Sequence, residues 1–239
     1  MGSMKKITYV IAFALSALSL SAQTTDGWES SADFGLTLTQ GNSETTLITT
    51  ALNFANDNGE TQQLAAISYT FGEAEGTKTT DVLNSFYTWN KLVSDSSYYG
   101  FRAEATRDDI ALIDYRLQAT ALYGFNVVKN DTVSVAVEFG PGYTAESVDD
   151  VEFDSAHLYF GQRASYKFSD STFFTQSLAA YAPFDEFDNY NFVFTLAAES
   201  KMSEKLSLRV AVENTYTNNP AAGAEKNDVK LVSGLSYKF

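Results

Sequence analysis

Apolar and polar residues alternate along nearly the whole of residues 27–239, and this period of two restricts the chain to a sheet-based fold. In one run, Ile113, Tyr115 and Leu117 fall on one face, whereas Arg116 and Gln118 fall on the other. Because successive side chains of a strand point to opposite faces, the pattern predicts strands with one apolar and one polar face. The runs are about ten to fourteen residues long, which exceeds the usual soluble strand and suits a tilted membrane strand.

Turn residues divide this pattern into about twelve strands. We expect them at residues 27–40, 44–57, 60–72, 79–92, 97–107, 110–127, 131–146, 153–168, 171–182, 189–202, 204–217 and 227–239. In 171–182, Phe173 and Phe174 face opposite ways, so the alternation does not fix which side meets lipid.

Tight turns such as 57–59 alternate with longer connections at 73–78, 147–152, 183–188 and 218–226. Short turns at one end and longer loops at the other are typical of bacterial outer-membrane barrels, and an even strand count places both termini at the short-turn end. The sequence therefore predicts an all-β fold, a single antiparallel up-and-down transmembrane β-barrel of about twelve strands.

Composition argues against several classes of protein. The 239 residues include no Cys and one His, which disfavours a disulfide scaffold, a zinc site or another metal centre. With 30 acidic against 16 basic residues, the chain lacks the basic face that a nucleic-acid partner requires. A mean hydropathy of −0.17 disfavours a bundle of transmembrane helices. We expect no cofactor, no metal and no nucleic acid.

The N-terminus has the pattern of an export signal. Residues 1–3 are interpreted as a cloning remnant, followed by Lys5 and Lys6, the apolar residues 7–20 and a small-residue cleavage site at Ser21 and Ala22. The apolar part is too short to cross about 30 Å of hydrocarbon as a helix. We expect a signal peptide over 1–22 and an outer-membrane β-barrel domain over 23–239.

Several motifs resemble one bacterial family. They are Thr39-Gln40-Gly41-Asn42-Ser43-Glu44-Thr45, Phe101-Arg102-Ala103-Glu104-Ala105-Thr106-Arg107-Asp108, Gly140-Pro141-Gly142-Tyr143-Thr144 and Gly234-Leu235-Ser236-Tyr237-Lys238-Phe239. Over nearly the whole of residues 23–239 the chain resembles the salt-induced outer membrane protein family, a domain of unknown function. The resemblance implies a barrel in the cell outer membrane of the Gram-negative envelope, linked by name to salt or acid stress. It supplies no ligand or reaction.

The last strand carries a second resemblance. Gly234, Tyr237 and Phe239 resemble the signal that the barrel-assembly machinery recognises, although Val232 stands where a polar residue is usual. An ordinary terminal strand is the alternative. We expect outer-membrane lipid and, during biogenesis, the barrel-assembly machinery as partners.

The polar faces predict a lining for the lumen. It comprises Asp33, Arg102, Glu104, Asp114, Arg116, Glu138, His157, Arg163, Glu199, Arg209, Glu213 and Lys230. Charges of nearly balanced sign in a narrow barrel are expected to pair. Two interpretations stay open, a polar pore lined by mixed charge and a salt-bridged plug that closes the lumen.

His157 is the residue on which a hydrolase would depend. Such chemistry needs a Ser nucleophile beside a His base, on the outer wall if the substrate is a lipid. The alternation instead places His157 toward the lumen, together with Ser155 and Tyr159. We expect a hydrogen-bonding role for His157 and no enzyme.

Two further groups stand out near the strand ends. Acidic residues crowd 146–154 and 185–188; they are interpreted as solvated loops, with weak binding of divalent cations or cation enrichment at a pore mouth as the alternative. Aromatic residues are expected to form girdles at the membrane interfaces. These are Trp28, Trp89, Tyr98, Tyr99, Tyr143, Tyr181, Tyr190, Tyr216 and Tyr237.

These observations favour an integral outer-membrane barrel with a stress-related or structural role and a polar, salt-bridged lumen. A narrow passive channel for small solutes or ions is the alternative. A soluble periplasmic barrel that binds a ligand, which would place its apolar faces inward and its polar faces outward, is a third hypothesis.

Overall fold

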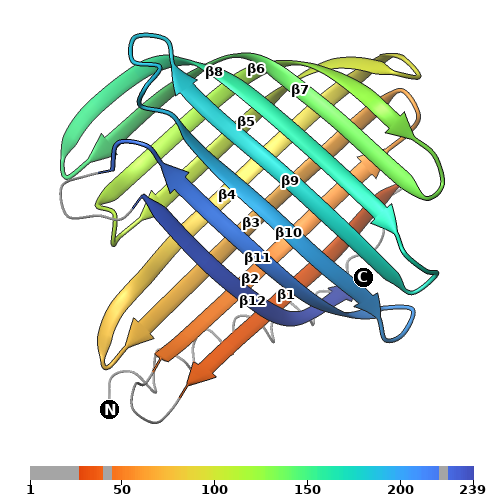
Figure 1. The fold of residues 1–239 in the computed structure, drawn as a ribbon, viewed down its shortest axis with the longest axis horizontal. Helices are drawn as coiled ribbons and strands as arrows, with labels where there is room; N and C mark the ends of the chain where they lie inside the picture. Colours follow the sequence, from red (N-terminus) through yellow and green to blue (C-terminus); the bar gives the residue numbers. More distant parts are fainter. Residues whose placement is uncertain (1–26, 40–44, 221–225) are drawn as a thin grey trace.

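A computed structural model describes residues 27–39, 45–220 and 226–239, which form a closed antiparallel barrel of twelve strands (Figure 1). Each strand pairs with its neighbours in the chain, and the first strand pairs with the last. The predicted fold is therefore confirmed, whereas the predicted signal peptide lies outside the described residues. The strands are β1 (Trp28–Thr39), β2 (Thr45–Asp57), β3 (Thr61–Ala74), β4 (Thr77–Ser94), β5 (Ser97–Asp108), β6 (Ile113–Lys129), β7 (Val133–Val148), β8 (Val151–Lys167), β9 (Thr172–Pro183), β10 (Asn191–Lys201), β11 (Leu206–Thr217) and β12 (Asn227–Lys238).

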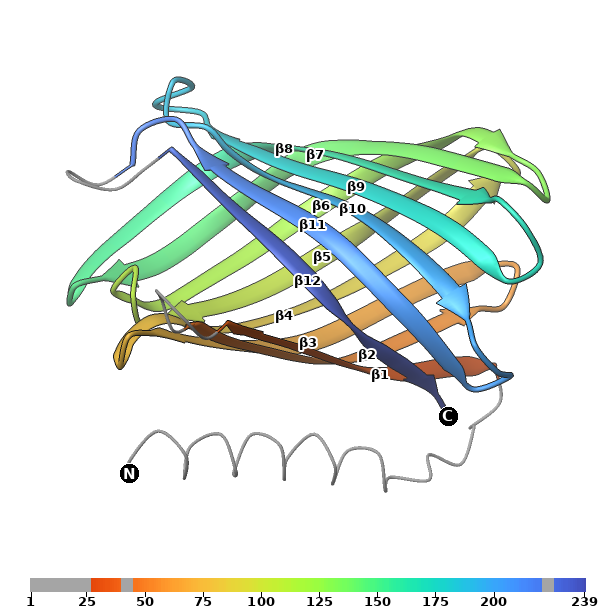
Figure 2. The same ribbon diagram turned by 60° about the horizontal axis from the view of Figure 1, so that its bottom comes forward.

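The two ends of the barrel differ in their connections. We call the end at which β1 begins and β12 ends the turn end; its connections are 58–60, 95–96, 130–132, 168–171 and 202–205. The opposite end, the loop end, includes the longer connections 109–112 and 184–190. Figure 2 shows the tilted strands running between these two ends.

Two of the predicted long loops are tight turns. Only Glu75 and Gly76 connect β3 to β4, and only Asp149 and Asp150 connect β7 to β8. All four residues have positive φ, between 49° and 78°, which matches the central pair of a type I′ hairpin turn. Because Asp and Gly tolerate this conformation well, strand pairing continues to the turn, and the predicted loops 73–78 and 147–152 are wrong.

The outward face of the barrel is apolar. Large exposed side chains on it include Ile67, Leu83, Leu117, Phe160, Leu196, Leu208, Leu231 and Leu235. An apolar belt of this extent on a soluble monomer would be unfavourable, whereas hydrocarbon accepts it. The hypothesis of a barrel with apolar faces inward is therefore wrong. Within the three described stretches, no helix is long and apolar enough to cross a membrane.

The register also settles the faces that the alternation left open. Phe174 pairs with Tyr166 on the outward face, whereas Phe173 points inward, where the Lys201 ammonium lies 4.8 Å from its ring centroid. Two members of the predicted aromatic girdles, Tyr98 and Tyr181, also point inward and are buried. Their placement in a girdle is wrong, because each packs against lumen residues of other strands.

The seam between β1 and β12 is the shortest ladder of the barrel. It pairs Ser31–Gly35 with Gly234–Lys238, and the two strands diverge toward the loop end (Figure 2). At Gly234 a Cβ atom would lie 2.0 Å from the Phe34 carbonyl oxygen, so only glycine allows this approach. The Phe239 amide donates to the Ser30 carbonyl oxygen at 3.0 Å, and the Phe239 ring lies edge-on to Tyr237. The residues of the predicted assembly signal thus lie along the closing seam.

Candidate functional site

The cross-strand register turns one face of every strand toward the lumen. On this face the pairs include Arg102 with Thr88 and Thr120, Glu138 with Gly161, and Glu199 with Arg209. Of the predicted lining, the following lie on the inward face: Asp33, Arg102, Glu104, Arg116, Glu138, His157, Arg163, Glu199, Arg209, Glu213 and Lys230. Asp114 lies instead at the loop-end rim, beside a register shift in β6, and accepts hydrogen bonds from the Ser147 hydroxyl and the Asp150 amide.

Glu138 is the centre of a buried network on β5, β7 and β8. Glu138 is 3% exposed, and its carboxylate accepts hydrogen bonds from the Tyr98 hydroxyl at 2.9 Å and the Tyr159 hydroxyl at 3.0 Å. The Arg163 guanidinium donates to the same carboxylate at 3.1 Å and to the Tyr98 hydroxyl at 3.2 Å. Both carboxylate oxygens are therefore satisfied, which a buried charge requires.

A second carboxylate, Glu104, anchors the adjoining part of the network. It accepts hydrogen bonds from the Arg102 guanidinium at 2.8 Å and from the Tyr181 hydroxyl. The same guanidinium lies 4.5 Å from the Phe86 ring centroid. The Tyr181 and Tyr159 rings, 5.2 Å apart, join the two halves of the network. The contact between Tyr181 on β9 and Glu104 on β5 passes over three intervening strands, so these side chains project into the lumen.

His157 belongs to the same network. Its Nδ1 lies 3.0 Å from the Thr144 hydroxyl and its Nε2 lies 3.3 Å from the Thr120 hydroxyl. Its ring lies edge-on to Tyr181, with the centroids 5.4 Å apart. Both ring nitrogens are thus engaged by threonine hydroxyls.

Inward-facing glycines make room for these large side chains. A Cβ atom at Gly124 would lie 2.2 Å from the Tyr98 ring, and one at Gly142 would lie 2.3 Å from the His157 ring. At Gly161 it would lie 2.7 Å from the Glu138 Cγ. The side chains therefore pack flat against the wall. We call the inward face of β4–β9, which carries this network, the packed wall.

The rest of the lumen has a different lining. The inward positions midway along β1–β3 and β10–β12 carry small side chains, and we call this face the open wall. They are Gly35, Thr49, Ala51, Ala66, Ser68, Thr195, Ala197, Ala211, Val232 and Gly234. Ala51, Ala66, Ser68 and Ala211 remain partly exposed to solvent, whereas Gly35 and Ala197 of the same wall are buried, as are Tyr98 and Tyr159 of the packed wall.

A cavity of about 590 Å³ fills the turn-end part of the lumen between the two walls. Arg163, Ser165 and Ser177 line it on the packed wall, and Leu64 and Arg209 line it on the open wall. Most of the residues that face it have polar side chains, together with Ala55, Leu64 and Ala136. The lumen is therefore hollow at this end rather than filled by side chains.

The ion pairs of the lumen join residues on the same strand or on neighbouring strands. Arg102 and Glu104 lie on one strand, and Arg163 pairs with Glu138 on the neighbouring strand. Arg116 pairs with Glu146 at 2.6 Å across β6 and β7, and Lys230 pairs with Asp228 at 3.4 Å on β12. No described ion pair reaches from the packed wall to the open wall. Likewise, no described Lys or Arg lies within ion-pair distance of Asp33, Glu199 or Glu213.

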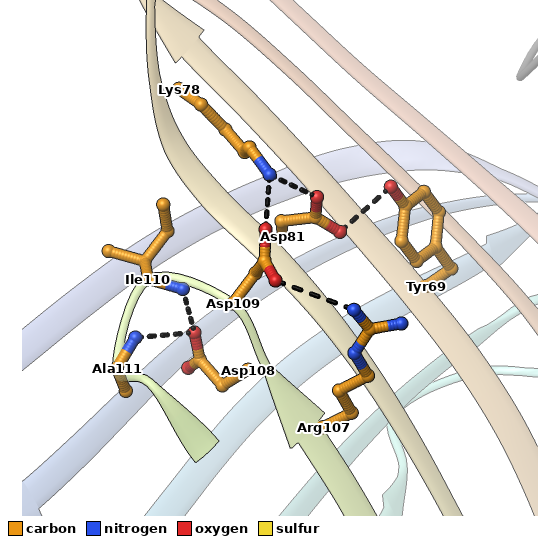
Figure 3. Close-up of polar contacts among 8 residues, drawn as sticks. All are labelled: Tyr69, Lys78, Asp81, Arg107, Asp108, Asp109, Ile110 and Ala111. Carbon is orange, nitrogen blue, oxygen red and sulfur yellow. Dashed lines mark hydrogen bonds and ion pairs between the residues drawn. The ribbon is translucent and has the colours of Figure 1, made fainter. Parts of the chain in front are cut away.

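A charged cluster lies outside the lumen, at the loop end of β3–β5 (Figure 3). The Lys78 ammonium contacts the carboxylates of Asp81, at 2.8 Å, and of Asp109. The Tyr69 hydroxyl donates to Asp81 at 3.0 Å, and Arg107 contacts Asp109 at 3.5 Å. The ammonium of Lys78 lowers the pKa of the Asp109 carboxyl below its usual value. These charges neutralise one another and tie the β3–β4 hairpin to the loop after β5.

Among the described residues, no group of three or more Asp, Glu or His side chains is placed to hold a metal ion.

The family described as "Protein of unknown function, DUF481" matches residues 32–239. The chain belongs to this family. Because the family description gives no activity, the link to salt that the sequence resemblance implied is not confirmed. A search of curated protein sequences gave no significant match.

Solved structures share the fold of this DUF481 chain at low sequence identity. The chain is similar to the NanC porin (TM-score 0.57, 7% identity, 88% of this chain and 100% of that chain covered). It is similar to the COG4313 outer membrane channel from Pseudomonas putida F1 (TM-score 0.56, 10% identity, 92% and 98% covered). It also resembles the KdgM porin in complex with disordered oligogalacturonate (TM-score 0.50, 9% identity, 88% and 99% covered). These similarities support the fold of an outer-membrane barrel.

Proposed function

We propose that this DUF481 chain is an integral outer-membrane barrel that acts as a narrow passive channel for small hydrophilic solutes or ions. Its apolar outward belt and its similarity to outer-membrane porins and channels support the location. The function rests on one observation, the division of the lumen into a packed wall and an open wall.

In a barrel of this strand number, the division into two walls determines whether the lumen is open. A barrel of about eight strands is just filled by its inward side chains, whereas sixteen or more leave an aqueous channel. With twelve strands the outcome depends on side-chain size. Tyr98, Tyr159 and Tyr181 gather on the packed wall, whereas Ala51 and Ala66 lie on the open wall. The space beside the open wall is therefore the path for a solute.

A closed, structural lumen is the competing interpretation. A plug requires side chains or ion pairs that join opposite walls. The described pairs Arg102–Glu104 and Arg163–Glu138 instead run along the packed wall. They stiffen one side of the lumen and leave the other side free, which favours the channel over a stress-related role with a sealed lumen.

We further propose that the barrel has no catalytic role. His157 is engaged by Thr120 and Thr144, and no serine hydroxyl contacts its ring nitrogens among the described hydrogen bonds. The arrangement fits a structural histidine better than a general base.

Conductance in a planar bilayer tests the proposed function. The chain, purified in detergent and shown by a heat-dependent gel shift to be folded, is expected to give steady unitary currents in molar KCl. Liposomes carrying it are expected to swell in small sugars and not in large oligosaccharides. A folded but electrically silent barrel would contradict the channel and favour a structural role in the envelope.

A further inference from the structure

We propose that the channel conducts small inorganic cations in preference to anions, and that fixed charge at its loop-end mouth and on its open wall sets this preference. The inference rests on the proposed channel function and names the class of solute that crosses. Two separate observations carry it, the charge difference between the two mouths and the unpaired carboxylates of the open wall.

Charged side chains are distributed unevenly between the two ends. We count those in the connections or within three positions of a strand terminus, among the described residues. The loop end carries fourteen carboxylates: Glu73, Glu75, Asp108, Asp109, Asp114, Glu146, Asp149, Asp150, Glu152, Asp154, Asp185, Glu186, Asp188 and Asp228. It carries five cations: Lys78, Arg107, Arg116, Lys226 and Lys230. The loop-end mouth is therefore strongly negative.

The turn end is close to neutral by the same count. It carries eight carboxylates: Glu29, Asp57, Glu60, Asp95, Asp131, Asp170, Glu199 and Glu204. It carries seven cations: Lys91, Lys129, Lys167, Lys201, Lys205, Arg209 and Lys238. The net negative charge of the described residues is thus concentrated at one mouth, and this part of the barrel is electrically polar along its axis.

The open wall carries two carboxylates, Asp33 and Glu213, that form no ion pair among the described residues. Asp33 accepts a hydrogen bond from the Asn53 amide at 3.1 Å through one oxygen, whereas its other oxygen is shielded and has no hydrogen-bond partner. Glu213 lies opposite Lys230 in the register, but the Lys230 ammonium turns to Asp228. On the packed wall, in contrast, Glu104 and Glu138 are each neutralised by an arginine. The interior carboxylates without an ion-pair partner therefore lie on the open wall, where Arg209 likewise has no partner among the described ion pairs and Lys230 lies beside Glu213.

These charges act on ions through their electric field, which the narrow passage concentrates. A narrow passage with low-dielectric walls concentrates the field of its lining and raises the local concentration of counter-ions. Rings of carboxylates at a mouth produce cation preference in channels. Mouth charges are exposed, so salt screens them, and the Debye length falls from about 10 Å at 0.1 M to about 3 Å at 1 M. Interior charges are screened less, which separates the two contributions experimentally.

Negative charge at the loop-end mouth can be removed by substitutions in the tight turn between β7 and β8. Asp149 and Asp150 have φ of 52° and 62°, a conformation that Asn tolerates as well as Asp does. The double variant Asp149→Asn/Asp150→Asn therefore removes two charges without straining the hairpin. Asp33→Asn/Glu213→Gln removes two charges from the open wall. Asp170→Asn, in an exposed turn at the turn end, is the matched control.

The reversal potential in a tenfold KCl gradient measures the preference. With the dilute side at 0.1 M, wild type is expected to pass K⁺ at least about threefold more readily than Cl⁻; as both solutions approach molar salt, the ratio falls to a smaller preference that the open-wall carboxylates maintain. The mouth variant is expected to lower the ratio at low salt only, and the open-wall variant at both salt concentrations. Asp170→Asn is expected to leave it unchanged.

The outcomes separate the two proposals. Steady currents with no ion preference, or with a preference for Cl⁻, would overturn this inference and leave the channel in place. A ratio that the two double variants do not change would overturn the assignment to these carboxylates. The absence of any current would overturn the proposed channel, and with it the inference.

Discussion

Replacing Tyr159 and Tyr181 by alanine is expected to raise the unitary conductance roughly twofold, because the two rings narrow the lumen from the packed wall. Both rings are buried and lie 5.2 Å apart at the centre of the network. Their removal widens the lumen in front of β8 and β9, and water and ions are expected to enter this space. Single-channel recording in molar KCl measures the change.

An outward tyrosine provides the matched control. Tyr123 is 40% exposed on the apolar face of β6, and Tyr123→Ala removes the same side chain without touching the lumen. Its conductance is expected to equal that of wild type. If Tyr159→Ala/Tyr181→Ala folds, as judged by its gel shift, and still conducts like wild type, then the packed wall does not border the passage.

Removal of the Glu138 carboxylate is expected to destabilise the barrel strongly. In Glu138→Leu, the Arg163 guanidinium and the Tyr98 and Tyr159 hydroxyls lose their common acceptor. Breaking a buried ion pair costs about 3–5 kcal/mol, and the partial exposure of Arg163 reduces this to about 2–3 kcal/mol. Urea unfolding of the barrel in lipid vesicles, followed by tryptophan fluorescence, gives the free energy of unfolding.

Two further variants test the reason for this loss. Glu138→Gln retains an amide oxygen as acceptor, so its loss is expected to be smaller than that of Glu138→Leu. Glu60→Gln breaks the exposed ion pair with Lys91 at the turn end and is expected to change the stability by less than about 1 kcal/mol. Equal stability of wild type and Glu138→Leu would show that the network is not needed to hold the packed wall.

Alternation along the sequence was sufficient to predict the barrel. Most runs keep one parity over most of their length, as Tyr115 to Phe125 do in β6, so the apolar faces and the number of strands follow from local pattern; the register shift between Ile113 and Tyr115, which buries Ile113, does not. The inward positions of Arg102, Glu138 and His157 follow from the same parity. Local pattern does not predict how far a hairpin continues: the residue types at Asp149 and Asp150 allow both a tight turn and a loop.

The packed wall could not be predicted, because it depends on contacts between distant strands. Tyr98 and Tyr181 have the composition and the position near strand ends that suit an interface girdle. They face the lumen because of the parity of their strands, and they fit there because Gly124 faces Tyr98 and Glu104 reaches Tyr181. Those relations depend on the stagger of the closed barrel. A glycine on the polar face of a strand is the one local signal that could have indicated an aromatic ring of another strand packed against that position in the lumen.

Cysteine accessibility shows whether water reaches the open wall along the lumen. The chain has no native Cys, so single substitutions report without background. Ala66→Cys lies on the open wall, Leu122→Cys lies beneath the network, and Ile67→Cys faces outward. A charged, water-soluble thiol reagent added during recording is expected to reduce the current of Ala66→Cys and to leave the other two unchanged. Reaction of Leu122→Cys with protection of Ala66→Cys, or no change of current at Ala66→Cys, would contradict the account.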